Sequence, residues 1–211
     1  MSQGKYSVQR ALSFAAGHGI DTGQGPIAGV DEAGRGPLAG AVYAAAVILP
    51  SDYDLPQLND SKKISEKQRN CLFDSIQQQA VCYAIASAQP GEIDEINIFQ
   101  ASMLAMHRAV KSLVRQPGFV YVDGTHCPQW DYRSVAITKG DSRVDCIAAA
   151  SILAKVARDR VMCELDLQYP GYGFARHKGY PTPAHLLALK QLGPSAVHRR
   201  SYAPVAACLE D

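Results

Sequence analysis

The order of the apolar segments along the 211-residue chain limits its possible folds most. Short apolar runs at residues 27–32, 41–49 and 81–88 come early, and further runs at 119–124 and 134–141 alternate with helical patterns. Runs of this length that end at glycine or proline are typical of buried strands. We therefore predict an α/β fold with a mixed β-sheet flanked by helices. Its first strands form an antiparallel meander, and its later strands join through helices.

Two helices are indicated by their capping residues. Ser65 and Gln68 fit a capping box, which predicts a helix from Glu66 to about residue 79. Near the C-terminus, Thr182 is a suitable N-cap, a proline follows it, and Gly193 comes where the helix should end.

Apolar patterns predict two longer helices, at about residues 98–114 and 145–169. The second is rich in alanine, which permits close packing against a sheet. Residues 1–25 are polar and glycine-rich and resemble a flexible leader. We therefore expect one catalytic domain over residues 26–211, including a helical C-terminal portion.

Composition describes an ordinary globular protein and names no partner. Hydrophobic residues make up 47% of the chain, charged residues 19%, and the net charge is +1. The six cysteines form no C-x-x-C pair, so a zinc ribbon is not indicated. Neither a signal peptide nor a membrane-spanning run is visible. We expect a cytoplasmic monomer without membrane association.

Charge is distributed unevenly along the chain. Residues 139–200 hold ten Lys and Arg against five Asp and Glu, a local net charge of +5, whereas residues 1–138 hold eleven against thirteen. The last third is therefore a candidate face for an anionic partner. The alternative is a solvated surface of mixed charge.

Four acidic residues share one setting. Asp31, Glu32, Asp123 and Asp141 each end an apolar segment beside a glycine-containing turn. If their strands are neighbours in the sheet, the carboxylates converge and repel one another. Mg²⁺ or Mn²⁺ would relieve that repulsion, and two such ions can catalyse displacement at phosphorus. The alternative for any single acid is a cap or an ordinary surface residue.

The segment "GVDEAGRGPLAG" places glycines around an arginine directly after the first two acids. Gly34 and Gly36 permit close approach of the main chain to a ligand, and Arg35 can meet a phosphate. The spacing is not that of a dinucleotide-binding fingerprint, and no G-K-[ST] of a P-loop is present. A small-molecule phosphotransferase is therefore disfavoured.

The chain also resembles a known family. The segments "GVDEAGRGPLAG", "NDSKKIS", "VYVDG", "IAAASILAKVARDR" and "HKGYPTPAH" are similar, in order and spacing, to those of bacterial ribonuclease HII, a type 2 ribonuclease H. The resemblance covers about residues 27–204.

The resemblance implies a ribonuclease H-like fold and metal-dependent cleavage of the RNA strand of RNA–DNA hybrids. It also implies incision 5′ of single ribonucleotides in duplex DNA, as in ribonucleotide excision repair, leaving 3′-hydroxyl and 5′-phosphate ends. The four acids match the metal-binding and catalytic acids of the family, with Asp31 between two Mg²⁺ or Mn²⁺ ions. No general base is assigned.

Substrate-binding positions are implied in the same way. In the family, the main chain of the loop that matches Gly34, Arg35 and Gly36 reads the ribose 2′-hydroxyl, the group that distinguishes RNA from DNA. Tyr180 matches a tyrosine that stacks near the RNA-to-DNA junction. The expected contacts to the nucleic-acid backbone are Asn59, Ser61 and Lys62, with Arg143, Arg176, His177 and Lys178 as weaker candidates.

Two other functions stay open from the residues. A module that binds hybrids without chemistry would use the basic C-terminal face but has no need of four acids. A nuclease of the same fold that acts on plain DNA would share the metal site. Such a nuclease would have no evident need of Arg35, its flanking glycines or Tyr180.

Overall fold

The structure is a computed structural model that describes residues 15, 17, 19–23, 25–56, 58, 61 and 64–209. Most of the expected leader, residues 1–25, therefore lies outside the described residues. In its described part, the main-chain carbonyl of Asp21 accepts a hydrogen bond from the Arg133 guanidinium over 2.9 Å. This contact joins the end of the expected leader to the loop before the last strand.

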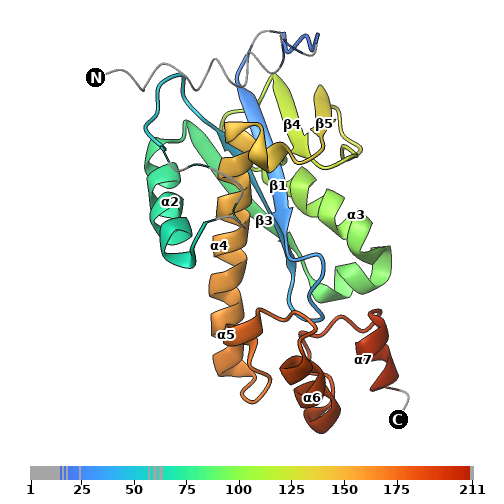
Figure 1. The fold of residues 1–211 in the computed structure, drawn as a ribbon. Helices are drawn as coiled ribbons and strands as arrows, with labels where there is room; N and C mark the ends of the chain where they lie inside the picture. Colours follow the sequence, from blue (N-terminus) through green and yellow to red (C-terminus); the bar gives the residue numbers. More distant parts are fainter. Residues whose placement is uncertain are drawn as a thin grey trace.

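The centre of the molecule is a mixed sheet of five strands, as predicted (Figure 1). Its spatial order is β3-β2-β1-β4-β5. The first three strands pair antiparallel, while β4 lies parallel to both β1 and β5. The strands are β1 (Ile27–Ala33), β2 (Val42–Ile48), β3 (Cys82–Ala88), β4 (Phe119–Asp123) and β5 (Ser134–Ile137).

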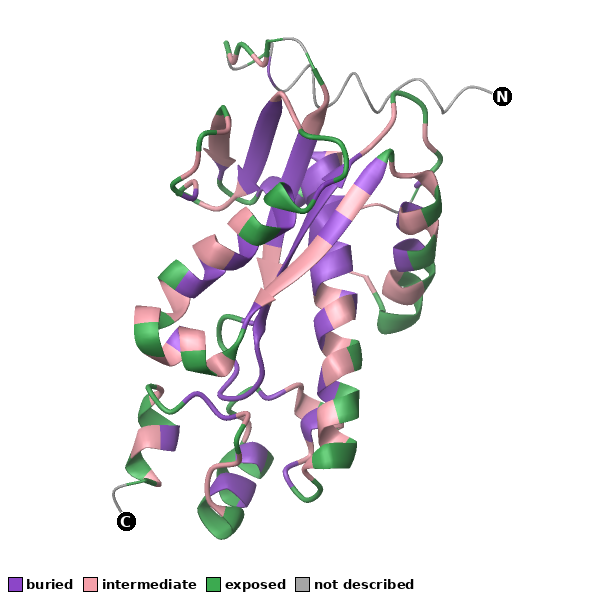
Figure 2. Cartoon of the chain, turned by 180° about the vertical axis from the view of Figure 1, so that it is seen from behind, coloured by how far each residue is buried: buried purple, intermediate pink, exposed green. Residues whose placement is uncertain are grey.

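Helices cover both faces of this sheet, as Figures 1 and 2 show from opposite sides. On one face, α4 (Asp145–Gln168) and α2 (Glu66–Gln79) pack against β2 residues such as Ala45 and Val47. On the other face, α3 (Pro90–Lys111) packs against the alternate β2 residues, Ala44 and Ala46 among them. Because β2 is buried on both faces, its sequence is apolar at nearly every position rather than alternating.

The small side chains allow α4 to lie very close to β1. A methyl group at Gly29, in the middle of β1, would overlap the main chain of Cys146 and Ile147 in the first turn of α4. The buried alanines of α4, at positions 148, 149, 150 and 154, continue this close contact along the helix. The predicted close packing of an alanine-rich helix on the sheet is confirmed.

The two helices predicted from caps are present with the predicted bounds. Ser65 and Gln68 form the expected capping box at the start of α2. The helix α6 (Pro183–Leu192) begins after Thr182, whose hydroxyl accepts a hydrogen bond from the main chain of His185 over 3.3 Å, and it ends before Gly193.

The helix predicted at residues 98–114 is longer at its N-terminal end, because α3 begins at Pro90. Asn97 has a positive φ of 65° and interrupts this helix. Its side-chain oxygen accepts hydrogen bonds from the main chain of Phe99 and Gln100, so a second helical segment starts there. The apolar pattern therefore indicated only this second segment.

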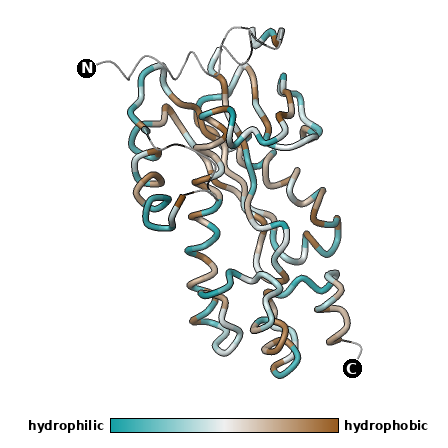
Figure 3. The backbone as a smooth tube through the Cα atoms, in the orientation of Figure 1, coloured by the Kyte–Doolittle hydropathy of each residue, from teal (hydrophilic) through white to brown (hydrophobic). Residues whose placement is uncertain are grey.

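The C-terminal portion lies at the end of the sheet where β1 turns back into β2 (Figure 1). It contains α6 and two short helices that were not predicted, α5 (Phe174–His177) and α7 (Ala203–Ala207). A bridge between Ala39 and His198 joins it to the β1–β2 turn. Figure 3 shows that hydrophobic residues concentrate in the sheet and recur in α6. No described helix is long and apolar enough to cross a membrane.

Candidate active site

The sheet brings three of the four predicted acids to one region. Asp31 and Glu32 lie near the end of β1, and Asp123 is the last residue of the parallel neighbour β4. The register pairs Val30 with Val122, so Asp31 and Asp123 are the next positions along the two strands. Parallel strands place their carboxyl ends at the same edge of a sheet, which explains how residues 92 positions apart meet.

The fourth acid reaches the site in a different way from the prediction. We expected a strand ending near Asp141, but β5 ends at Ile137 and Asp141 lies in a short 3₁₀ helix, Gly140–Ser142. Lys139 precedes this helix in the left-handed region, with φ 55°, and so ends the extended run. The side-chain oxygen Oδ1 of Asp123 accepts hydrogen bonds from Gly140 N, at 2.7 Å, and from Asp141 N, at 3.3 Å.

Asp31 is costly to keep ionised. Its side chain is buried, and desolvation, followed by the charges of Glu32 and Asp123, raises its pKa well above the ordinary value. Desolvation also raises the pKa of Glu32. Arg35 opposes that shift, because its guanidinium lies 3.6 Å from the Glu32 carboxylate. These carboxyl groups therefore interact electrostatically, as the sequence pattern predicted.

The donor set suits a hard divalent cation. Carboxylate oxygens are the ligands that Mg²⁺ and Mn²⁺ prefer, and a cation would offset both the burial and the repulsion that raise the pKa of Asp31. Within the described residues, however, no three His, Cys, Asp or Glu side chains already stand as a complete metal-ligand group. Two acids have other partners: Asp123 bonds the main chain at Gly140, and Glu32 faces Arg35. Only the Oδ1 atom of Asp123 takes part in these bonds, so its other oxygen can face a cation, whereas Glu32 would exchange Arg35 for the cation.

The glycine-arginine-glycine loop lies directly beside these acids. Gly34 is buried and has φ 98°, a conformation that favours glycine, while Arg35 and Gly36 are exposed. The Tyr180 ring lies against Gly36, because a Cβ atom there would be 3.5 Å from its Cε1 atom. Tyr180 is 42% exposed, so its ring is accessible to a ligand.

The loop between β2 and α2 is described only in part. Asn59 and Lys62, both expected to contact nucleic acid, lie outside the described residues. Ser61 is described and buried, and its hydroxyl lies 2.8 Å from that of Ser151 on α4. The Ser151 hydroxyl also donates a hydrogen bond to Asp31, which favours the ionised carboxylate. Ser151, which the sequence analysis did not single out, thus connects Ser61 to the acidic site.

Two side chains predicted to contact phosphate, those of His177 and Lys178, instead bond to groups within the protein. The His177 ring bonds the main chain at Tyr172 and Gly179. Lys178 donates from its Nζ atom to the Ala175 carbonyl over 2.6 Å and to Cys163 Sγ over 3.2 Å. Arg143 lies at the surface after the 3₁₀ helix, and Arg176 is exposed on α5.

The positive charge counted over residues 139–200 is not all at the surface. Arg158 and Arg199 are 1% and 0% exposed, so two of the ten cations lie inside the protein. Arg158 donates to the carbonyls of Ala39, Ala41 and Lys178. Fewer cations are therefore available at the surface than the sequence count suggested. The two buried arginines donate hydrogen bonds to main-chain carbonyls instead.

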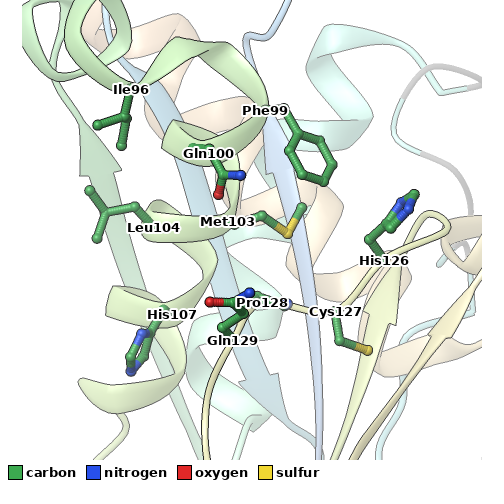
Figure 4. Close-up of a pocket in the computed structure, with 10 residues that line it drawn as sticks. All are labelled: Ile96, Phe99, Gln100, Met103, Leu104, His107, His126, Cys127, Pro128 and Gln129. Atoms are coloured by element: carbon green, nitrogen blue, oxygen red, sulfur yellow. The ribbon is translucent and has the colours of Figure 1, made fainter.

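A separate pocket of about 460 Å³ lies between α3 and the loop after Asp123. Figure 4 shows apolar α3 side chains on one side and the loop from His126 to Gln129 on the other. Phe99 and His126 meet edge to face there, with ring centroids 5.4 Å apart. The four acids are not among the residues that line this pocket, so it is distinct from the acidic site.

A comparison with family sequence models identifies the relatives of the chain. The model described as ribonuclease HII matches residues 28–205, which is most of the chain and includes all four acids, the glycine-arginine-glycine loop and Tyr180. The chain belongs to the ribonuclease HII family. It is therefore a ribonuclease H, a hydrolase, and the resemblance noted in the sequence is confirmed.

Solved structures agree with this family assignment. Ribonuclease H2 from Pyrococcus horikoshii OT3 is 28% identical, with a TM-score of 0.71 over 87% of this chain and 97% of that one. Ribonuclease HII from Archaeoglobus fulgidus, solved in a complex with PCNA, is 27% identical, with a TM-score of 0.64 over 84% and 95% of the two chains. Bst ribonuclease HIII, solved with Mn²⁺, is 16% identical over 90% and 71%, with a TM-score of 0.66, and shares the fold.

Proposed function

We propose that this ribonuclease HII cleaves the RNA strand of RNA–DNA hybrids and incises 5′ of single ribonucleotides in duplex DNA. The observation that carries the proposal is the position of the glycine-arginine-glycine loop, with Arg35 and Gly36 exposed, beside the buried carboxylate of Asp31. A site suited to phosphate chemistry therefore lies next to a segment of main chain that can approach a sugar closely. Removal of ribonucleotides from DNA would be its role in excision repair.

Asp31, Glu32, Asp123 and Asp141 would hold two divalent cations, Mg²⁺ or Mn²⁺. When bound, such ions supply an activated water and stabilise the leaving oxygen of the phosphodiester. The chain itself supplies a cluster of carboxylates whose mutual repulsion favours cation binding. Main-chain N–H groups at Gly140 and Asp141 hold Asp123 in place through its Oδ1 atom. The products would carry 3′-hydroxyl and 5′-phosphate ends.

Substrate selection would come from the loop and from Tyr180. The main chain of Gly34, Arg35 and Gly36 would contact the ribose 2′-hydroxyl, which only the ribonucleotide has. The accessible Tyr180 ring beside Gly36 would stack on the sugar of the following deoxynucleotide. The Arg35 guanidinium, 47% exposed, would exchange Glu32 for a substrate phosphate once that carboxylate binds a cation.

Incision of a labelled DNA duplex with one central ribonucleotide tests the proposal. The same duplex without the ribonucleotide is the substrate control, and each is incubated with Mg²⁺, Mn²⁺ or EDTA. We expect metal-dependent cutting 5′ of the ribonucleotide, lost in Asp31→Asn and kept in Asp131→Asn, which changes an exposed acid in the loop before β5. Equal cutting of the all-DNA duplex would instead support a general nuclease.

The number of metal ions needs a measurement of its own. Calorimetric titration of Mn²⁺ into the protein with a bound, uncleavable substrate analogue counts the sites. Two sites in the wild type, with fewer or weaker sites in Asp141→Asn, are expected. One site of unchanged affinity in both proteins would contradict the two-metal proposal.

A further inference from the structure

Arg199 is a buried cation whose partners are concentrated on the glycine-arginine-glycine loop. Its Nη2 atom donates to the Gly34 carbonyl over 2.6 Å and its Nη1 atom to the Arg35 carbonyl over 2.9 Å. Its Nε atom donates to the Gly40 carbonyl over 2.9 Å. The Tyr202 hydroxyl donates to the same Arg35 carbonyl over 2.6 Å. Two side chains about 165 residues further along the chain thus bond the carbonyls of this loop from the protein interior.

These hydrogen bonds fix the direction of the loop's N–H groups. In a planar trans peptide, the carbonyl and the following N–H point in opposite directions. Because the carbonyls of Gly34 and Arg35 point inward to Arg199 and Tyr202, the N–H groups of Arg35 and Gly36 point outward. Both residues are exposed, and neither N–H donates to an acceptor within the part of the chain that the structure describes.

The packing behind Gly34 also leaves this arrangement little freedom. A Cβ atom at Gly34 would overlap the Arg158 guanidinium, which itself bonds Ala39. The segment that carries Arg199 is attached in turn, because Arg199 N donates to the Leu38 carbonyl over 2.8 Å. On the following residues, Asp94 of α3 accepts hydrogen bonds from the main chain of Arg200 and Ser201. The loop is therefore held against two anchored elements.

We propose that Arg199 and Tyr202 are positioning residues for ribose recognition. They hold two carbonyls inward so that the N–H groups of Arg35 and Gly36 face a ribonucleotide as ready donors. The 2′-hydroxyl is the substrate group that these donors would meet, so the inference rests on the proposed function. Preorganised donors contribute more to selection than donors that a ligand must first order. Neither Arg199 nor Tyr202 contacts the substrate in this role.

The test compares two tyrosines that make the same bond in different places. Tyr202→Phe removes the 2.6 Å bond to the Arg35 carbonyl and the 2.9 Å bond that the hydroxyl accepts from Arg199 Nη1. The control Tyr172→Phe removes a 2.6 Å bond to the Gly193 carbonyl. Arg199→Lys keeps the charge but not the planar set of donors. Each is combined with Asp123→Asn, which should block cleavage under the proposed function while its side-chain oxygen can still accept from Gly140.

Binding is measured by fluorescence anisotropy with Mg²⁺, on a duplex containing one ribonucleotide and on its all-DNA counterpart. The readout is the ratio of the two dissociation constants, together with the thermal midpoint of each protein. Loss of the Tyr202 hydroxyl, which bonds both the Arg35 carbonyl and Arg199, should lower this preference about three- to tenfold in Tyr202→Phe. The preference should fall further in Arg199→Lys. Tyr172→Phe should keep the preference, even where its thermal midpoint falls.

An unchanged preference in Tyr202→Phe would overturn the inference while leaving the proposed function intact. Should Arg199→Lys fail to fold, Tyr202→Phe still decides, because it removes one hydroxyl only. If the Asp123→Asn parent itself bound both duplexes equally, ribose recognition by the loop would be wrong, and this inference with it. The incision assay reports cleavage separately, so the two failures are distinguishable.

Discussion

Acidification should destabilise the protein through one pair of buried histidines. Ser195 N donates to His198 Nδ1 over 3.0 Å, so that nitrogen is an acceptor and the proton of neutral His198 is on Nε2. His198 Nε2 lies 3.1 Å from His185 Nε2, and His185 Nδ1 lies 3.0 Å from the Tyr180 carbonyl. The chain of bonds is complete only if both rings are neutral, because an added proton would face another donor.

The size of the effect follows from the pKa of His198. Burial, and then the neighbouring His185, lower this pKa from 6.5 to about 4. One pKa unit corresponds to about 1.4 kcal/mol, so the difference is worth about 3 kcal/mol. Since His198 is only 2% exposed, solvent does not screen the effect.

The sign is set by which state binds the proton. Between pH 6.5 and about 4 the unfolded chain binds a proton at residue 198 and the folded protein does not. The contribution of His198 is therefore fully present above pH 6.5. It is lost progressively as the pH falls toward 4, by up to about 1.4 kcal/mol for each pH unit.

Urea unfolding from pH 4.5 to 7.5 measures this contribution. His198→Gln keeps a donor near the Nε2 position but does not titrate, so the wild type should lose more stability than this variant on acidification. His126→Gln, at an exposed histidine, is the matched control and should follow the wild type. The difference between wild type and His198→Gln isolates this group, because acids such as Glu92 titrate equally in both proteins. If that difference stayed constant over the pH range, the neutral-pair reasoning would be refuted.

Three further predictions concern the sheet, the site and the last long helix. Asp31→Asn should raise the thermal midpoint in EDTA by about 2–4 °C at pH 7.5, since it removes a carboxylate whose pKa is raised by burial and then by neighbouring charges. An unchanged or lower midpoint would argue that these effects do not destabilise the folded protein. Gly29→Ala should lower the free energy of unfolding by about 2 kcal/mol or more in urea, because the methyl group overlaps Cys146; a loss under 0.5 kcal/mol would contradict the close approach of α4. Thr182→Ala should cost about 1 kcal/mol in the same assay through loss of the α6 cap, while Thr182→Ser should cost less.

The elements predicted well are those whose signal is local. The caps of α2 and α6 lie within three residues of the helix starts they define, and the structure has both helices at the predicted bounds. The central strands were also found, because burial on two faces leaves them almost wholly apolar. The first part of α3 was missed since Asn97 divides it. The 3₁₀ helix at Asp141 was missed because Lys139 carries no turn signal of its own.

The acids could be grouped from the sequence because each follows an apolar segment that ends in a turn. Their proximity depends on the pairing of β1 with β4, which the chain order alone does not specify. The prediction rested on the assumption that the strands are neighbours, and the sheet order confirms this for β1 and β4. Ser151 was not predictable in the same way. Its hydroxyl reaches Asp31 only because alanines bring α4 close to the sheet.

Arg199 shows why charge in a sequence is a poor guide to charge on a surface. Counted along the chain, it belongs to a basic segment that favours an anionic partner, and its neighbour Arg200 is indeed exposed. In the fold it is 0% exposed and bonds three carbonyls, so it offers no guanidinium for direct contact with a phosphate at the surface. A buried cation is costly unless polar groups solvate it. Two of the carbonyls that solvate Arg199, those of Gly34 and Arg35, also direct the loop's N–H groups outward, so in the proposed role one set of bonds would serve both stability and recognition.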